Sequence, residues 1–381
     1  MPTDFSTRHW SDVVIIGGGI IGSSIALRLA QAKLKVCVLD RGEPGAEASS
    51  AAAGMVAPYG ERVEPDSFFE FCRASHAMYP DFVAEVEELA GSRVGYRRDG
   101  TLMVALKNEE VAELNDIEQC QAMQGLAHER LTGEEARKRV PALAPDALGA
   151  LFIPQDHWVD NQLLTAAVIS AARRNGVTFV SQSAVRKFNL ARNRVESVDV
   201  NGGADGSRGT FSADVFILAA GCWSGELMRS VGVSLPTKPC RGQMMEFESS
   251  SLFPWVLRAG KHYLVPRSEG RVVIGTTSEY AGFEKAVTGD GLRSILAGAA
   301  RIAPGVGEFK FRRAWAGLRP DTADHLPILG RSDWENLIFA TGHFRNGILL
   351  APVTAQLISE LVLTGSTSKP IEAYRPTRFA P

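Results

Sequence analysis

The sequence has little cysteine, no excess of charge of either sign and no long hydrophobic run. Its five cysteines are far apart in 381 residues and form no C-x-x-C pair, which argues against a disulfide framework or a zinc site and favours a reducing compartment. With 41 Lys and Arg against 43 Asp and Glu, nothing attracts nucleic acid or an anionic membrane surface. No stretch approaches about 20 uninterrupted apolar residues, so no spanning helix is expected. We therefore expect a cytoplasmic protein with no metal, nucleic-acid or membrane partner.

The most informative feature is a glycine-rich turn near the N-terminus. An apolar run over 13–16 is followed by Gly17, Gly19 and Gly22, which fill the G-x-G-x-x-G pattern. The first glycine permits a sharp turn, the second lets a pyrophosphate approach the backbone, and the third lets helix and strand pack closely. The helix expected next offers free N–H groups and a positive dipole end to phosphate. The pattern predicts a dinucleotide site.

A second apolar run, 36–39, ends in Asp40. This carboxylate lies about 20 residues past the glycines, where an acidic residue accepts the hydroxyls of the adenosine ribose. Glycine-rich turns are common, and Asp40 alone is compatible with an ordinary strand end. The ordered succession of strand, glycines, helix, strand and acid nevertheless favours the dinucleotide site. The run of small residues over 48–55 is expected to be a ligand loop, with a plain flexible loop as the alternative.

The rest of the chain alternates between helical and strand patterns. Apolar strands typical of a parallel sheet occur near the start, near 215 and near 338, whereas 240–277 alternates like antiparallel sheet. Helices are expected over 66–90, 109–127, 132–140, 161–174, 288–302 and 348–364, the third of which opens with a capping box of Thr132 and Glu135. A surface turn is expected over 201–206. Strands are expected over 96–106 with a turn at Gly100, and over 177–180, 185–188, 195–200, 213–221, 243–247, 262–265, 271–275, 309–316 and 337–341. The pattern predicts an α/β fold in which a discontinuous dinucleotide domain is interrupted twice by an α+β, sheet-based second domain.

Several separate stretches coincide with one family. The chain resembles the D-amino-acid-oxidase superfamily of flavoproteins over nearly its whole length, and within it most closely the glycine oxidases of bacterial thiamine synthesis. The matching stretches are 14–23, 50–55, 263–267, 315–320 and 342–352. The stretch 14–23 is shared by many flavoproteins and dehydrogenases, whereas 315–320 and 342–352 are specific to the family.

The resemblance implies FAD rather than NAD. It implies a discontinuous Rossmann-like FAD-binding domain of residues 12–92, 151–235 and 318–366, and an antiparallel-sheet substrate-binding domain of residues 93–150 and 236–317. Relatives that bind flavin covalently carry a cysteine near Gly317 and Leu318, and this chain has none after Cys240. We therefore expect non-covalent FAD, which weakens a monomeric sarcosine oxidase interpretation. A homo-oligomer is also expected, with a tetramer as one form.

The resemblance also assigns cofactor contacts. It places the pyrophosphate at Ile20 and Ile21, the ribose at Asp40, the adenosine beside Arg41, and the adenine next to Val185. It brings two segments to the flavin: Ala48, Ser49, Ala53, Gly54 and Met55 from the small-residue run, and His343, Phe344, Arg345, Asn346, Gly347, Ile348 and Leu349 from the loop before the last helix. Backbone donors of that loop would hold negative charge at the flavin N1–C2=O edge. His343 has no evident acid–base partner, so a backbone role for its segment is equally compatible.

Three residues are candidates for the substrate site. Arg319 would clamp the substrate carboxylate, because a guanidinium pairs bidentately and fixes orientation as well as charge. Small and apolar neighbours favour a cleft position for Arg319 over an exposed one. Tyr263 would bond the same carboxylate or close the pocket, with a plain core position as the alternative. Arg345 would either contact substrate or pin the flavin loop.

The resemblance implies oxidation of glycine and small amino acids, such as sarcosine and D-alanine, to a 2-oxo acid, ammonia or amine, and hydrogen peroxide. Dioxygen would be the acceptor, the amine would bind neutral, and hydride would leave Cα without a dedicated base. The reaction would serve thiamine thiazole synthesis. Because Ser278 stands where some glycine oxidases carry methionine, the preferred substrate stays open.

Two other interpretations compete with the oxidase. One is a D-amino-acid dehydrogenase that passes electrons to a membrane quinone, although no basic amphipathic helix for membrane docking stands out. The other is a non-catalytic flavoprotein scaffold, which would have no need for Arg319 or Tyr263.

Overall fold

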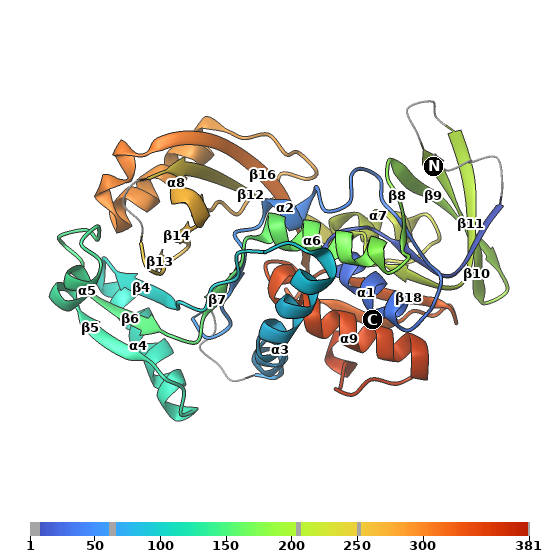
Figure 1. The fold of residues 1–381 in the computed structure, drawn as a ribbon, viewed down its shortest axis with the longest axis horizontal. Helices are drawn as coiled ribbons and strands as arrows, with labels where there is room; N and C mark the ends of the chain where they lie inside the picture. The colour runs from blue at the N-terminus through green and yellow to red at the C-terminus, as the bar shows by residue number, and fades with distance from the viewer. Residues whose placement is uncertain (1–7, 61–65, 203–206, 250–252, 380–381) are drawn as a thin grey trace.

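The computed structural model describes residues 8–60, 66–202, 207–249 and 253–379. Figure 1 shows an elongated molecule that contains two large sheets, one at each end, and each sheet is covered by its own helices. The first sheet holds the N-terminal glycine turn and the last helix, and the second holds the antiparallel strands. The α/β class with parallel and antiparallel strands is as predicted.

The first sheet is parallel at its centre, and its central strands are buried on both faces, as is typical of a parallel sheet. Val13, Val14 and Ile15 are at most 1% exposed. Its strand order is β17-β18-β11-β1-β2-β8, with β10 paired to β11 and β9 to β10. The strands are β1 (Arg8–Ile16), β2 (Val36–Leu39), β8 (Thr178–Val180), β9 (Ser183–Ala191), β10 (Arg194–Gly202), β11 (Ser207–Leu218), β17 (Ile328–Arg331) and β18 (Leu337–Thr341).

Four helices cover one face of this sheet. They share one hydrophobic cluster and pack against one another, with α1 beside α9 although the two lie at opposite ends of the chain. The helices are α1 (Ile20–Gln31), α3 (Ser67–Ala90), α6 (Asn161–Arg174) and α9 (Gly347–Thr364), and α7 (Ser224–Arg229) packs with β9 on the other face. The N-terminal glycine turn and the segment before α9 are thereby brought to the same edge of the sheet.

The second sheet has the order β16-β12-β15-β14-β13-β4-β6-β5. Its pairs are antiparallel except β13 with β4. Helices α5 and α8 pack on one face and α4 on the other. The elements are β4 (Thr101–Ala105), α4 (Asn108–Met123), β5 (Glu129–Thr132), α5 (Gly133–Arg139), β6 (Gly149–Ile153), β12 (Thr237–Glu248), β13 (Val256–Ala259), β14 (His262–Pro266), β15 (Arg271–Gly275), α8 (Gly289–Ile302) and β16 (Lys310–Thr322).

Short elements connect these two bodies. A two-strand ribbon of β3 and β7 follows the four-residue helix α2, and several 3-10 turns lie in loops. These elements are α2 (Ala48–Ala51), β3 (Met55–Val56), β7 (His157–Trp158), η1 (Gly221–Trp223), η2 (Ser268–Gly270), η3 (Pro304–Glu308), η4 (Glu372–Tyr374) and η5 (Pro376–Phe379).

Several boundaries differ from the sequence-based expectations. The run 48–55 is not a plain loop, because it contains α2 and β3. The strand expected over 96–106 is confined to β4, which begins directly after the predicted turn at Gly100, where φ is 91°. The strand expected to reach 221 ends at Leu218. The surface turn expected over 201–206 lies mostly outside the described residues. Strands β5, β6, β13 and β17 and helix α7 were not predicted.

The domain bounds stay a prediction. Strands β6 and β16 each run across one of the proposed bounds, because each strand is continuous within the second sheet.

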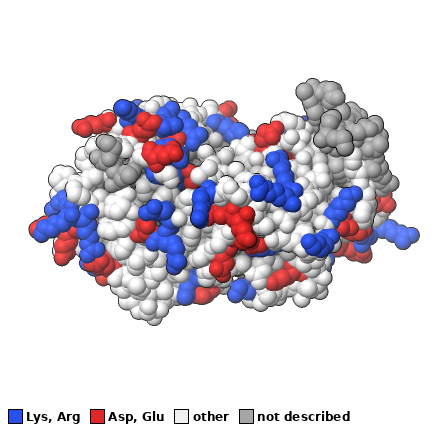
Figure 2. Space-filling view, viewed as in Figure 1, with Lys and Arg blue, Asp and Glu red and all other residues white. Residues whose placement is uncertain are grey.

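Thr132 and Glu135 form the predicted capping box of α5. All five cysteines are buried, and none of them forms a disulfide. Among the helices within the described ranges, none is both long and apolar enough to cross a membrane. Figure 2 shows acidic and basic side chains interspersed over the visible face, so no field of one sign dominates that face.

Candidate cofactor and substrate site

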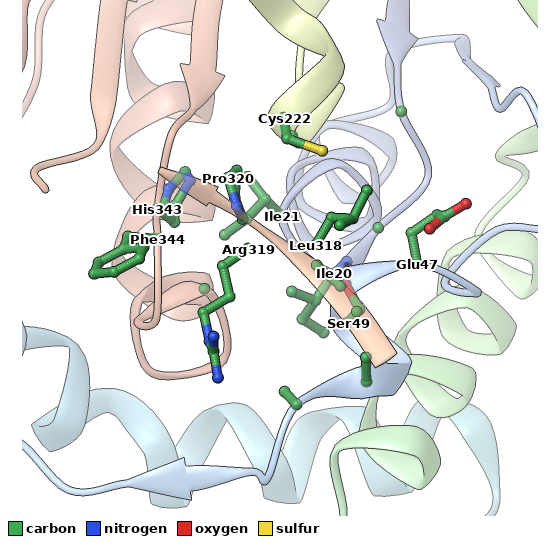
Figure 3. A pocket seen from close by; sticks show the side chains of 18 of the residues that line it. Ile20, Ile21, Glu47, Ser49, Cys222, Leu318, Arg319, Pro320, His343 and Phe344 are labelled. Atoms are coloured by element: carbon green, nitrogen blue, oxygen red, sulfur yellow. Dashed lines mark hydrogen bonds between the residues drawn. The ribbon is translucent and has the colours of Figure 1, made fainter. Parts of the chain in front are cut away.

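A cavity of about 540 Å³ lies where the two sheets meet. It is lined by the start of α1, the end of β2, the α2 segment, the second sheet and the loop before α9. Figure 3 shows Arg319 on β16 between His343 and Phe344 on one side and Ile20 and Ser49 on the other. Every residue proposed above for cofactor or substrate lines this cavity, with the exception of Gly22.

The glycine turn explains that exception. Gly17 has a φ of +108°, and a Cβ there would lie 2.4 Å from the Ala219 carbonyl oxygen. A Cβ on Gly22 would lie 2.0 Å from the carbonyl oxygen of Gly17. Gly22 therefore allows α1 to pack against the turn, the role expected of the third glycine, and it has no need to face the cavity.

The N-terminus of α1 offers an anion site. Gly19 is the N-cap and makes no side-chain cap, and the first turn has no acidic residue. The amide of Ile20 donates to Ser49 Oγ at 2.9 Å, which leaves the serine hydroxyl hydrogen for a further acceptor. The amides of Ile21 and Gly22 lie in the first turn, where helix geometry provides no acceptor. These donors and the helix dipole suit a pyrophosphate.

Asp40 is held in place at the end of β2. Its Oδ2 accepts from the Gly18 amide at 2.7 Å and its Oδ1 from the Gly42 amide at 2.8 Å. Burial raises the pKa of the Asp40 carboxyl, and those two amide bonds oppose the rise. Each carboxylate oxygen keeps a second lone pair, which suits a ribose hydroxyl.

Two residues flank Asp40 in the cavity. The Arg41 guanidinium stacks over the Trp223 ring at 4.0 Å and lies 3.9 Å from a Glu47 carboxylate oxygen. Val185 on β9 lines the same part of the cavity and is 6% exposed. A flat ring with an apolar wall beside it is compatible with the predicted adenine position.

Three side chains donate hydrogen bonds to the backbone of the small-residue segment 48–55. Arg267, which is 5% exposed, donates to the Ala53 carbonyl at 2.5 Å. Trp315 Nε1 donates to the Ala51 carbonyl at 3.1 Å, and Asn161 Nδ2 to the Ser49 carbonyl at 2.8 Å. Burial lowers the pKa of Arg267 to about 10. The backbone of α2 and the residues after it is thereby fixed by side chains from α6, from β16 and from the residue after β14.

The N-terminus of α9 is a second uncapped helix end at the same cavity. Asn346 is the N-cap without a side-chain cap, and no acidic residue stands in the first turn. The amides of Gly347, Ile348 and Leu349 therefore lack helical acceptors, and all three residues line the cavity. One uncapped helix end for a pyrophosphate and another for an anionic ring edge fit a flavin dinucleotide.

His343 supports this loop from inside. It is 2% exposed, and its Nε2 bonds Thr354 Oγ1 at 3.1 Å. Burial lowers the pKa of His343 to about 3, so the ring is neutral near pH 7. Its hydrogen bond is with α9 itself, which favours the backbone role for this segment over acid–base work by the side chain.

A stability measurement tests this burial. Because the pKa of His343 is lowered to about 3 in the folded protein, the unfolded chain binds more protons below about pH 6.5. Stability is therefore lost as pH falls from that value. At pH 5 the loss is about 2 kcal/mol, and His343→Asn should flatten the fall in chemical-denaturation curves measured from pH 7.5 to 5. Gly305→Ala, where nothing lies within 4 Å of the added Cβ, should keep the wild-type slope, and equal slopes for both variants would contradict the assignment.

Arg319 is positioned by the segment that follows β15. Its Nη2 donates to Thr276 Oγ1 at 2.7 Å and its Nη1 to the Thr277 carbonyl at 3.1 Å. A Cβ on Gly242 would lie 2.3 Å from Nη2, so this glycine provides the space for the guanidinium. Within the described residues Arg319 has no acidic partner, and its remaining N–H donors suit a carboxylate ligand.

The other two substrate candidates differ in exposure. Tyr263 is 8% exposed and donates to Met244 Sδ at 3.3 Å. Arg345 is exposed, with its guanidinium 5.6 Å from the centre of the Phe344 ring. Both line the cavity, as does Ser278, and their roles stay predictions.

Sequence reasoning missed the residues that hold the candidate site. Gly242 carried a usable signal, because a glycine inside an alternating strand marks a close approach. Thr276, Thr277 and Arg267 carried none, since their partners lie 42 to 214 positions away in the chain.

A dinucleotide cradle and an arginine-bearing sheet that share one cavity are the arrangement of a flavin-dependent oxidoreductase. Residues 12–361 match the family model described as DAO, FAD dependent oxidoreductase, and the chain belongs to this family. Membership confirms the predicted family and FAD as the cofactor, and it makes the chain an oxidoreductase.

Individual relatives agree with this assignment. Glycine oxidase of Bacillus licheniformis is 32% identical over 374 residues, which cover 97% of this chain and 98% of that protein. The crystal structure of glycine oxidase from Geobacillus kaustophilus has a TM-score of 0.91 and 32% identity, covering 97% and 99% of the two chains. The bifunctional protein ThiO/ThiG of Synechocystis is 37% identical over 377 residues, but these cover only 54% of it, so the chain spans about half of that relative.

Proposed function

We propose that the chain is an amino-acid oxidase of the glycine oxidase type. It takes glycine, sarcosine or a small D-amino acid together with dioxygen, and it releases hydrogen peroxide and an imine that hydrolyses to a 2-oxo acid and ammonia or amine. FAD, bound without a covalent link, supplies the two-electron chemistry. The observation that carries the proposal is the position of Arg319, a cation without an acidic partner in the described residues, at the cavity shared with the dinucleotide cradle.

The chain's own residues bind and orient the substrate. Thr276 and Thr277 occupy two donors of Arg319, and the remaining donors pair with the substrate carboxylate. Fixing that group at two points restricts the direction of the Cα–H bond, so orientation supplies much of the rate. Tyr263, whose ring lines the same wall, closes the pocket or adds a bond to the carboxylate.

The distribution of acidic side chains around the cavity bears on the protonation state of the bound substrate amine. Among the described residues, the cavity's acids are Asp40, Glu43, Glu47 and Glu226, which belong to the first sheet, its helices and the adjoining loops, whereas the lining residues of the second sheet include none. No carboxylate on that wall would hold the amino group as an ammonium ion. This supports binding of the neutral amine without a dedicated base.

A link to thiamine thiazole synthesis is proposed from the relatives. The Synechocystis relative is named as a fused ThiO/ThiG protein, and this chain aligns with about half of it. The imine made here would then serve as the building block of a thiazole-forming partner.

The decisive assay uses the purified flavoprotein. Acid precipitation should release the flavin into solution. Glycine, sarcosine and D-alanine are added without oxygen and then in air, while the flavin absorbance and peroxide are followed. Bleaching followed by rapid reoxidation with peroxide supports the oxidase. Bleaching with fast reoxidation only by a quinone supports the dehydrogenase. No bleaching with any amine would reject both and leave the scaffold.

Adding one methyl group at Gly242 tests the clamp without touching Arg319. A Cβ there would lie within 2.5 Å of the guanidinium carbon and both of its terminal nitrogens, so Gly242→Ala should displace the side chain. We expect kcat/KM to fall about 10- to 100-fold, mainly through KM, because misplaced contacts typically cost 1–3 kcal/mol. Steady-state kinetics measure this. Gly305→Ala, with nothing within 4 Å of its added Cβ, should match the wild type, and equal kinetics for both variants would contradict the clamp geometry.

A further inference from the structure

Two buried hydroxyl groups of α3 hold the first turn of α9. Tyr79 Oη donates to the Ile348 carbonyl at 2.7 Å, and Ser75 Oγ donates to the Leu349 carbonyl at 2.6 Å. Both side chains are 0% exposed, and neither lines the cavity. They therefore contact the turn from behind, on the side away from the site.

Pro352 explains why these carbonyls need outside donors. In a regular α-helix the carbonyl of Ile348 accepts from the amide of residue 352, but Pro352 lies inside α9 and has no N–H. Tyr79 supplies the missing donor. Ser75 Oγ also accepts from the Val353 amide at 3.4 Å, so this hydroxyl stands between the two groups that a regular helix would join directly.

The Tyr79 bond acts on the peptide group of a residue that lines the cavity, and the Ser75 bond acts on the peptide group that closes the turn. The carbonyl of Ile348 and the N–H of Leu349 belong to one peptide group, and Leu349 lines the cavity. A donor on the carbonyl polarises the group and strengthens its N–H as a donor. The carbonyl of Leu349 likewise shares a peptide group with the Leu350 amide, which closes the turn on the Asn346 carbonyl at 2.8 Å.

We propose that Tyr79 and Ser75 are positioning residues that orient and polarise the first-turn amides of α9 toward the anionic edge of the flavin ring, and so raise the flavin's midpoint potential. The proposal rests on the placement of the flavin against this loop. Reduction places negative charge at the N1–C2=O edge, so stronger and better-aimed donors stabilise the reduced form more than the oxidised form.

Tyr79 is suited to this work at every working pH. Burial raises its pKa well above the usual value of a tyrosine, so the hydroxyl stays protonated and remains a donor. Its ring packs among Phe82 and Tyr96 at centroid distances of 6.0 and 5.7 Å, which fixes the direction of the hydroxyl.

The test removes the Tyr79 hydroxyl that donates to the Ile348 carbonyl, and then supplies a backbone amide at position 352 as a replacement donor. Tyr79→Phe keeps the ring and loses the bond, and the midpoint potential is measured by anaerobic dye-coupled reduction, which needs no amine substrate. We expect a lower potential and FAD binding about tenfold weaker, equivalent to about 1.4 kcal/mol. In the double variant Tyr79→Phe with Pro352→Ala, the new amide at 352 can donate to the Ile348 carbonyl, and the potential should return toward the wild-type value.

A matched control separates positioning from stability. Tyr374 is 3% exposed and donates to the Ser67 carbonyl at the start of α3 at 3.3 Å. Tyr374→Phe should lower thermal stability while leaving the potential unchanged. The proposal is overturned if Tyr79→Phe loses stability as the control does but keeps the wild-type potential, or if the double variant shows no recovery. Either result is independent of whether any amino acid is oxidised, so it is distinguishable from failure of the proposed function.

Discussion

Arg319→Ala is expected to lower kcat/KM for small amino acids about 1,000-fold while the flavin stays bound. Removing one partner of a desolvated, hydrogen-bonded charge pair costs about 2–5 kcal/mol, much of it from the charge left unpaired. The guanidinium is partly buried and is held by Thr276 and Thr277. Its removal would therefore leave the substrate carboxylate without its charged partner in the cavity wall. Steady-state kinetics and the flavin absorption spectrum of the same preparation measure the two halves of this expectation.

Two variants control the experiment. Arg319→Lys keeps the charge but loses the planar fork, so its activity should lie between those of the wild type and the alanine variant. Arg312→Ala removes an exposed arginine from the same strand, where it pairs with Glu248, and should leave kcat/KM unchanged. If Arg319→Ala keeps activity within about tenfold, the carboxylate is held elsewhere, and Arg345 is the next residue to replace.

The dinucleotide half of the protein was predictable because its signals are local. Strand β1, the glycine turn, α1 and β2 follow one another within residues 8–39, and each is specified by its own apolar run, turn or cap. The capping box of α5 was readable for the same reason, since Thr132 and Glu135 are three residues apart.

Elements whose stability depends on distant partners were missed. Strand β13 has only four residues and pairs in parallel with β4, which lies more than 150 positions earlier. Neither length nor period distinguishes so short an apolar run from a loop. Likewise, α2 is a four-residue turn whose carbonyls are held by Trp315 and Asn161, so its form is decided by tertiary contacts.

The candidate site divides in the same way. The residues named from sequence lie in stretches with their own composition, such as the glycines or the loop before α9. The groups that orient them come from other parts of the chain: Thr276 bonds Arg319 across 43 positions, and Tyr79 bonds Ile348 across 269. A local pattern can indicate which residues touch a ligand, but the supports behind them appear only when the chain is folded.

Gly22→Ala is expected to weaken FAD binding at least about 100-fold, although Gly22 does not line the cavity. The added Cβ would lie 2.0 Å from the Gly17 carbonyl oxygen and 3.3 Å from Ala219 Cβ, so α1 must move away from the turn. The amide of Ile20 would then leave Ser49, and the cradle would lose its shape. The size follows from about 3 kcal/mol for overpacking against backbone that cannot yield.

Helix propensity predicts the opposite sign, which makes the experiment decisive. Alanine is about 1 kcal/mol better than glycine inside a helix, so without the clash Gly22→Ala would stabilise α1. Gly289→Ala, at the first residue of α8 with nothing within 4 Å of the new Cβ, should leave FAD binding unchanged. Titration of the apoprotein with FAD and thermal melts compare the two variants.

Gly19→Ala provides a second, milder perturbation in case Gly22→Ala does not fold. Its Cβ would meet only the Ser49 hydroxyl, at 3.2 Å, so the helix can stay in place while the serine is pushed from the Ile20 amide. We expect weaker FAD binding with a melting temperature close to that of the wild type. Wild-type FAD affinity in both variants would mean that the pyrophosphate does not lie at the start of α1, because neither the packing of this helix nor its Ser49 contact would then matter to the cofactor.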